Sequence, residues 1–123
     1  MTETGLILVV DDDETIQETV RAALELDGYR VVTAADGAAA LGLLDDLAPC
    51  VILLDMRMPV LDGWGFAAAY RGREAPHAPL VVMTAAENAQ RWCREIGADA
   101  CLAKPFELDD LYGAVERFCR QAA

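Results

Sequence analysis

Five short apolar segments recur along the 123-residue chain, and each has the length of a β-strand. They occupy residues 6–10, 29–33, 51–54, 80–83 and 100–103. The segments that begin at residues 6, 51 and 80 are apolar throughout and do not alternate with polar residues, which is typical of strands covered on both faces. This pattern predicts a parallel sheet between two layers of helices.

Apolar residues at helical spacing follow each strand segment, over residues 16–24, 41–48, 66–70, 89–96 and 108–118. Thr15 and Glu18 have the spacing of a capping box, and Gly28, Pro49 and Gly97 are expected to end helices. A strand and a helix therefore alternate five times. We predict one α/β domain over residues 1–123, a three-layer sandwich with right-handed crossovers and the flavodoxin-like strand order 2-1-3-4-5.

The composition indicates a folded domain with a large negative charge. Hydrophobic residues make up 54% of the chain, and ten Lys and Arg oppose 21 Asp and Glu, for a net charge of −11. Such a field repels phosphate backbones and anionic lipids, so direct nucleic-acid binding is not expected. No apolar stretch has the length of a membrane span and the N-terminus has no basic signal region, so we expect a cytoplasmic protein that does not enter membranes.

Four cysteines are widely and irregularly spaced at Cys50, Cys93, Cys101 and Cys119. The sequence contains no CxxC pair, and its single histidine, His77, lies between two prolines in a loop-like stretch. This spacing argues against a zinc site. We expect reduced thiols that are buried as small hydrophobic side chains, as in cytosolic proteins.

Polar side chains stand directly after four of the predicted strands. Asp11 and Asp12 follow the first strand, Asp55 the third, Thr84 the fourth and Lys104 the fifth. Ligands of open parallel sheets bind outside the carboxyl ends of the strands, where the strand order reverses. We therefore expect these carboxylates, the hydroxyl and the ammonium to meet at one rim of the sheet.

The chemistry of this predicted rim suits phosphoryl transfer. Clustered carboxylates repel one another unless a cation joins them, and hard carboxylate oxygens in an open, hydrated site favour Mg²⁺. A carboxylate that attacks phosphorus meets an anionic electrophile, so the transition state needs a metal ion, an ammonium and a hydroxyl donor. Asp13 extends the acidic run, and capping of the following helix is the commoner use of an Asp at such a position.

These residues resemble the receiver domain of two-component response regulators. The resemblance is carried by Asp11-Asp12 after LILVV, Asp55 in VILLDMRMPVLDGWG, Thr84-Ala85 after LVVM, and Lys104-Pro105-Phe106. It covers nearly the whole chain, and the four motifs together are far more specific than any one of them. Pro59 and the Asp62-Gly63 pair are interpreted as turn residues that shape the loop after the third strand.

The resemblance implies that Asp55 is the phospho-acceptor and takes its phosphoryl group from a histidine kinase or a histidine phosphotransfer protein. Thr84 and Lys104 would contact the phosphoryl oxygens, and the Lys104–Pro105 peptide bond is expected to be cis. Such a domain catalyses its own phosphorylation and slow dephosphorylation and has no separate substrate, so it is not expected to be an enzyme in the usual sense.

The resemblance also implies the metal ligands. Mg²⁺ would be held by Asp12, by Asp55 and by the backbone carbonyl of Arg57, while Asp11 would hold a metal-bound water.

Other functions fit the sequence less well. A pseudo-receiver, which binds partners without phosphoryl turnover, is the main alternative, but the intact set of site residues argues against it. A phosphatase of the haloacid-dehalogenase type needs a carboxylate two residues after its nucleophile, and Arg57 stands there. A flavodoxin needs a Ser, Thr or Gly phosphate cradle after the first strand, where this chain has acids.

Two features depart from the family pattern and concern the switch residues Thr84 and Cys101. Cys101 stands three residues before Lys104, where receivers that couple this position to the threonine usually have an aromatic residue. The segment from Thr84 to Gly97 also looks shorter than usual. Because the small side chain of cysteine changes little surface when it moves between buried and exposed positions, we predict that phosphorylation changes the fifth helix only slightly. The alternative is that Cys101 is a tolerated packing substitution and the switch runs through backbone shifts.

By the same resemblance, downstream partners should bind the face formed by the fourth helix, fifth strand and fifth helix. Those partners stay unidentified at the level of the sequence. We expect a monomer or a weak dimer.

Overall fold

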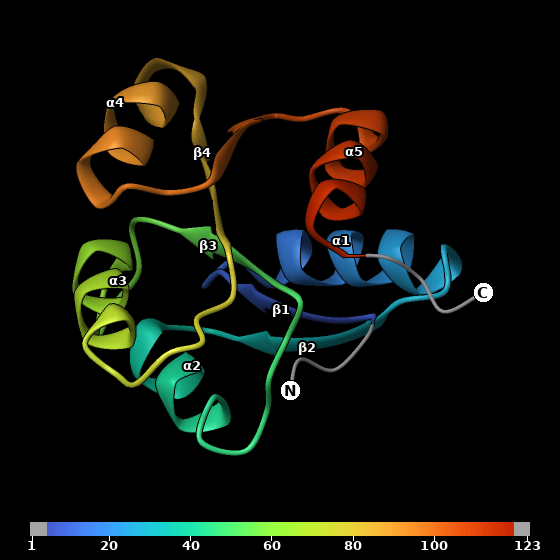
Figure 1. Cartoon of the computed structure of the whole chain (residues 1–123). Coiled ribbons are helices and arrows are strands. Elements are labelled where there is room, and N and C mark those ends of the chain that lie inside the picture. Colours follow the sequence, from blue (N-terminus) through green and yellow to red (C-terminus); the bar gives the residue numbers. More distant parts are fainter. Residues whose placement is uncertain (1–4, 120–123) are drawn as a thin grey trace.

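A computed structural model describes residues 5–119 and shows alternating strands and helices (Figure 1). The strands are β1 (Leu6–Val10), β2 (Arg30–Ala34), β3 (Val51–Asp55), β4 (Leu80–Ala85) and β5 (Ala100–Lys104). The helices are α1 (Glu14–Leu26), α2 (Gly37–Leu43), α3 (Gly63–Arg71), α4 (Ala86–Ile96) and α5 (Leu108–Phe118). Each predicted strand and helix is present, with its ends displaced by a few residues.

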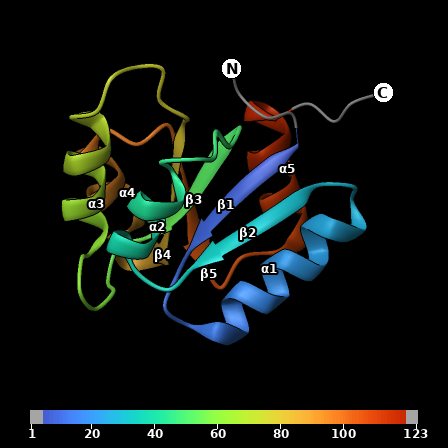
Figure 2. The ribbon, with the colours of Figure 1, turned by 90° about the horizontal axis from the view of Figure 1, so that it is seen from below.

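The five strands form one parallel sheet in the order β2-β1-β3-β4-β5, which confirms the predicted topology. Helices α1 and α5 cover one face of the sheet, and α2, α3 and α4 cover the other (Figure 2). All residues of β1 and β3 are buried, as expected for strands with helices on both faces. No helix within residues 5–119 has both the length and the apolar character needed to cross a membrane.

Each face of the sheet has its own apolar core. Side chains of successive strand residues, such as Leu53 and Leu54, point to opposite faces of the sheet and join different cores. On one face Leu24 of α1 and Leu111 of α5 are fully buried, and on the other Phe66 of α3 is fully buried. The two cores together fix the strand ends that form the rim.

The first helix begins differently from the prediction. Asp13 is its N-cap, and the Asp13 carboxylate accepts hydrogen bonds from the backbone N–H groups of Thr15 and Ile16. The expected capping box at Thr15 and Glu18 is therefore wrong, because Thr15 already lies within α1. Asp13 has the capping role that an Asp before a helix commonly has.

The second helix is shorter than predicted. It begins after Asp36, whose carboxylate accepts from the N–H of Ala39, but it ends at Leu43 rather than near Pro49. The following turn contains Asp45 and Asp46. Their negative charges oppose the macrodipole at a helix C-terminus, which favours the early end. The fourth helix ends as predicted, with Gly97 in the left-handed conformation at φ 62°.

The cysteines correct one expectation. Cys50 and Cys119 form a disulfide with a Cα–Cα distance of 5.4 Å, so these two thiols are not reduced in the structure. The two residues are 69 positions apart, and the pairing arises because the end of α5 packs beside the start of β3. Cys93 and Cys101 are free, but Cys93 is only half-buried and Cys101 is exposed. Neither behaves as a buried hydrophobic residue.

Candidate functional site

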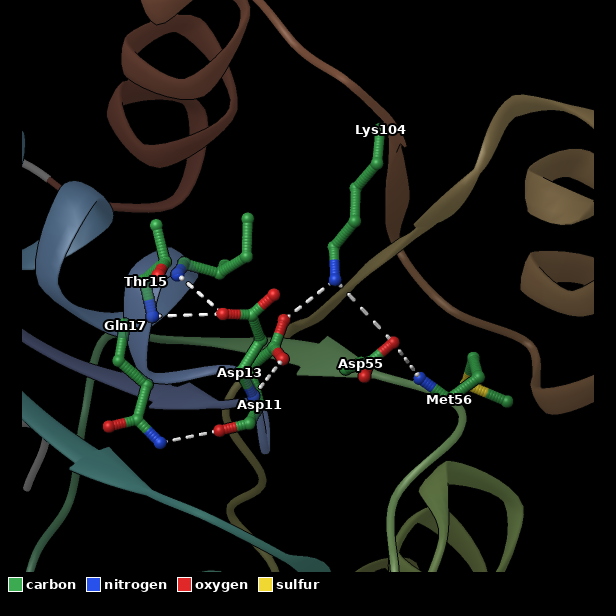
Figure 3. A network of polar contacts seen from close by, with 8 residues as sticks. Asp11, Asp13, Thr15, Gln17, Asp55, Met56 and Lys104 are labelled. Carbon is green, nitrogen blue, oxygen red and sulfur yellow. Dashed lines mark hydrogen bonds and ion pairs between the residues drawn. The ribbon is translucent and has the colours of Figure 1, made fainter.

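The carboxyl ends of β1, β3 and β5 bring Asp11, Asp55 and Lys104 to one rim (Figure 3). Asp55 pairs in register with Met83, so Thr84 extends one residue further toward the rim on the neighbouring strand. Thr84 in turn pairs with Ala103, the residue before Lys104. The register of the parallel strands therefore places these side chains at adjacent strand ends.

Asp11 is the buried anchor of the site. Its residue is fully buried, and one carboxylate oxygen accepts from the backbone N–H of Asp13 at 2.9 Å. The other oxygen accepts from Lys104 Nζ at 2.7 Å. Gln17 donates a side-chain hydrogen bond to the Asp11 carbonyl. These contacts fix the Asp11 carboxylate and hold the Lys104 ammonium in place.

Lys104 lies between two carboxylates. Its Nζ contacts Asp11 Oδ2 and also lies 3.7 Å from Asp55 Oδ1 (Figure 3). The Lys104–Pro105 peptide bond is cis, as expected. Lys104 is thus a site residue and not a solvated surface lysine.

Asp55 is a carboxylate whose charge is unfavourable in its surroundings. It is 8% exposed at the end of β3, and its Oδ1 accepts from the backbone N–H of Met56 at 2.9 Å. Burial, and then the negative charges of Asp11 and Asp12, raise the pKa of Asp55 to about 6, against the opposing effects of Lys104 and the Met56 N–H. Removing water disfavours the charged form, which makes Asp55 a carboxylate that gains from any added positive charge.

The acidic cluster is suited to a divalent cation. Carboxylate oxygens of Asp11, Asp12 and Asp55 lie within 4.8 Å of one another, and Asp12 is exposed. Three carboxylates face the single ammonium of Lys104, so negative charge remains in excess within the cluster. Hard oxygen donors that are partly open to water are the ligands of Mg²⁺. The donor set therefore fits the metal that the sequence predicted.

The loop after β3 folds back tightly on the backbone of Asp55. A side chain at Gly63 would lie 2.9 Å from the Asp55 carbonyl oxygen and 2.7 Å from Met56 Cα, so only glycine fits there. Asp62 caps α3 by accepting from the N–H of Gly65. This supports the interpretation of the Asp62-Gly63 pair as turn residues and adds the capping role.

The same loop contains a strained turn. The N–H of Leu61 donates to the Pro59 carbonyl at 2.7 Å, and Val60 between them has φ 68°. This is a γ-turn of the uncommon sign, and a β-branched residue rarely adopts it. The strain lies within five residues of Asp55, and such strain collects at functional sites.

The family assignment follows from comparison with known proteins. The profile of the family described as "Response regulator receiver domain" matches residues 7–116. The chain belongs to the response regulator receiver family. This receiver domain is 35% identical over 119 residues to response regulator MprA of Mycobacterium sp. (strain KMS), covering 95% of this chain and 51% of that protein.

A second relative is the positive alginate biosynthesis regulatory protein of Pseudomonas aeruginosa, which is 39% identical over 117 residues, covering 93% of this chain and 47% of that protein. The receiver domain thus spans about half the length of these curated relatives.

Solved structures agree with the family assignment. The chemotaxis response regulator CheY4 of Vibrio cholerae is 32% identical, with a TM-score of 0.82 over 94% of this chain and 99% of that one. The receiver domain of the sensor histidine kinase PA1611 from Pseudomonas aeruginosa is 33% identical, with a TM-score of 0.85 over 94% of this chain and 98% of that one. That structure has a magnesium ion coordinated in its active-site cleft.

One feature of the receiver domain was not anticipated from its sequence. The Arg57 guanidinium carbon lies 4.9 Å from the ring centroid of Trp92 on α4, and Trp92 packs edge-on against Trp64 of α3. Trp64 donates to a carboxylate oxygen of Glu95 at 2.9 Å. The resemblance implies a role for Arg57 through its backbone carbonyl alone, so the contact of its side chain with Trp92 is not expected from it. The spacing of these residues along the chain carries no signal for this contact.

Cys101 lies apart from the acidic cluster. It is exposed on β5, in register with Val82, three residues before Lys104. The structure therefore brings Asp11, Asp55 and Lys104 into direct contact and places Thr84 at the adjacent strand end, while Cys101 is exposed on the edge strand β5.

Proposed function

We propose that this chain is a phosphorylation-switched signalling domain in which Asp55 accepts a phosphoryl group from a phosphohistidine. The supporting observation is the position of Asp55, with Lys104 Nζ at 3.7 Å and the carboxylates of Asp11 and Asp12 within one cluster. A carboxylate oxygen of Asp55 attacks phosphorus, the P–N bond of the donor breaks, and its electron pair returns to the imidazole nitrogen, which then takes up a proton. The donor is a histidine kinase or a histidine phosphotransfer protein, acting in the cytoplasm.

The side chains of the rim have separate tasks in this transfer. Asp55 must be ionised to attack, and a pKa of about 6 leaves it mostly ionised at neutral pH and more basic than an ordinary aspartate. Lys104 balances the negative charge that gathers on the phosphoryl oxygens, and the Thr84 hydroxyl donates a hydrogen bond to one of them. Asp11 orients the ammonium through its 2.7 Å contact.

The same cluster would hold Mg²⁺ through Asp12, Asp55 and the Arg57 carbonyl, with Asp11 acting through a water. When bound, the metal neutralises carboxylate and phosphoryl oxygen charge during the transfer. We infer that the domain catalyses its own phosphorylation and its slow dephosphorylation and turns over no separate substrate. A pseudo-receiver would have no need of the Asp11–Lys104–Asp55 contacts.

An apolar groove beside the acceptor offers a place for the donor protein. It has a volume of about 340 Å³ and lies between α1 and the segment after β5. Its lining consists of Ile16, Thr19, Val20, Lys104, Pro105 and Phe106. Because Lys104 belongs both to the groove and to the rim, a donor seated there brings its phosphohistidine next to Asp55.

Intact-mass spectrometry with acetyl phosphate and Mg²⁺ tests the acceptor. We expect the wild type to gain one phosphoryl group and Asp55→Asn to gain none, because the amide is no longer a nucleophile. Asp13→Asn is the matched control, since Asn also caps helices and Asp13 takes no part in the proposed transfer. It should be phosphorylated like the wild type. Stoichiometric phosphorylation of Asp55→Asn would show that the acceptor is a different residue.

A further inference from the structure

The two free cysteines lie side by side, although α4 carries one and β5 the other. Gly97 ends α4, and the chain turns back so that the N–H of Ala98 donates to the Cys93 carbonyl at 2.8 Å. The Cys93 thiol points along this turn toward β5 and donates to the Ala100 carbonyl at 3.3 Å. The next residue is Cys101, whose thiol lies close enough to Cys93 to affect its ionisation. The turn at Gly97 thus creates a pair of adjacent thiols.

The two thiols differ in access to solvent. Cys101 is exposed on an edge strand, and it lines a surface hollow of about 590 Å³ between β5 and α5. The same hollow is lined by small residues such as Ala103 and by larger and charged ones, including Phe106, Asp109 and Arg117. Cys93 is a residue of α4 and is half-buried. A reagent from solution therefore reaches Cys101 first.

The chemistry of the half-buried thiol suits a second, slower step. Burial, and then the nearby Cys101, raise the pKa of Cys93 to about 11, so at neutral pH this thiol is protonated and unreactive on its own. Part of that effect comes from negative charge on Cys101. A mixed disulfide at Cys101 removes this contribution, whereas burial and the negative charge of Asp99 still hold the pKa of Cys93 high, so the second attack is slow.

We propose that Cys93 and Cys101 form a dithiol modification site, separate from the phosphorylation site, at which a small organic disulfide produces an intramolecular disulfide between α4 and β5. The Cys101 thiolate attacks one sulfur of the reagent, forms a mixed disulfide and releases one thiolate. Cys93 then loses its proton and attacks the Cys101 sulfur, releasing the second thiolate. Two protein thiols are oxidised, and one reagent disulfide is reduced to two thiols.

The location gives this bond a consequence for the proposed switch. Cys93 directly follows Trp92, whose ring lies over Arg57 in the loop after Asp55. A bond from Cys93 to β5 would fix the C-terminal half of α4 to the sheet edge. Oxidation should therefore restrict α4 and leave the acceptor rim accessible.

Peptide mapping can test the site, since trypsin places every cysteine in a different peptide. Cys50 falls in 31–57, Cys93 in 92–94, Cys101 in 95–117 and Cys119 in 118–120. The folded protein is treated with oxidised glutathione, then denatured so that every remaining thiol is blocked with iodoacetamide, and digested without reduction. We expect 92–94 linked to 95–117, and the number of iodoacetamide-reactive thiols to fall from two to none.

Two single variants separate the steps. Cys93→Ser should stop at glutathione bound to Cys101, and Cys101→Ser should keep a free Cys93 without glutathione. Phosphorylation by acetyl phosphate should be unchanged in both, so failure at this site is distinguishable from failure at Asp55. The proposal would be overturned if wild-type protein accumulates glutathione on Cys101 without the linked peptides, or if the link joins two chains on a non-reducing gel.

Discussion

Strands β3 and β5 each deliver one charged group to the rim, but their surroundings are opposite. Every residue of β3 is buried between β1 and β4, and Asp55 continues that buried strand. β5 forms an edge of the sheet, and of its five residues only Leu102 is buried. The proposed acceptor is therefore built into the most constrained strand and the ammonium into one of the least constrained.

This difference indicates which side of the site can respond to phosphorylation. Movement of Asp55 would disturb packing on both faces of the sheet, whereas Lys104 is half-buried and held at its Nζ by Asp11 and Asp55. A new phosphoryl group would compete for that ammonium. We expect the resulting shifts in β5, in α4 and in the loops, while β3 stays fixed.

The largest expected effect is on stability, from truncating the buried strand. Leu53→Ala should lower the free energy of unfolding by about 2–5 kcal/mol, because Leu53 is fully buried between β1 and β4. Cys101→Ser on β5 should change it by less than about 0.5 kcal/mol, since Cys101 is exposed. Urea unfolding of both variants measures this contrast. Equal losses would remove the distinction between the strands.

The second prediction concerns pH. The pKa of Asp55 rises from 3.8 to about 6 on folding, so between these values the native state binds a proton that the unfolded chain has released. The contribution of Asp55 to stability therefore falls as pH rises through this range and stays unfavourable above it. In metal-free buffer at pH 7, Asp55→Asn should stabilise the domain by about 1–2 kcal/mol, allowing for screening by solvent.

Melts of Asp55→Asn and wild type from pH 4 to pH 7 test this prediction. The variant should show the weaker decline in stability with pH. Asp13→Asn is again the control and should follow the wild type. The same pH dependence in Asp55→Asn and wild type would mean that folding does not raise the pKa of Asp55.

The third prediction is a stabilisation of similar or smaller size by Mg²⁺. Binding to the native state alone contributes about 1.4 kcal/mol at tenfold excess over Kd. Asp12→Asn should reduce this contribution and raise metal-free stability, because it removes one of three clustered negative charges. Thermal melts with and without MgCl₂, using CaCl₂ for comparison, measure both effects. A wild-type melt that does not respond to Mg²⁺ would exclude the proposed metal site.

The smallest effect is expected in α5. Amide hydrogen exchange with and without beryllofluoride, a stand-in for the phosphoryl group, should show changes in residues 84–90 and in the loop after Asp55. Residues 107–119 should change little, because Cys101 has no ring to move between buried and exposed positions. The contact between Arg57 and Trp92 instead connects the loop after Asp55 directly to α4. Comparable changes in α5 would show that the switch runs through the backbone of β5 despite Cys101.

The sequence by itself determined the alternation of strands and helices along the chain and the composition of the rim, while the strand order was expected from the flavodoxin-like fold class. Apolar periodicity, turn residues and the strand-end positions of Asp55, Thr84 and Lys104 are local signals, and a parallel sheet necessarily gathers the carboxyl ends of its strands at one edge. The resemblance then supplied roles for these residues. Helix ends were less predictable, as Asp13 and the early end of α2 show, because capping depends on the local backbone geometry.

Tertiary structure alone decided which side chains share a contact. Lys104 lies nearer to Asp11 than to Asp55, Cys50 pairs with Cys119, and Arg57 lies over Trp92. Cys93 and Cys101 meet only because α4 ends at Gly97 and the chain returns along β5. Each of these contacts joins residues whose separation along the chain carries no periodic signal. They depend on how helices pack against the sheet, which is set by the shape of the whole core rather than by any segment of it.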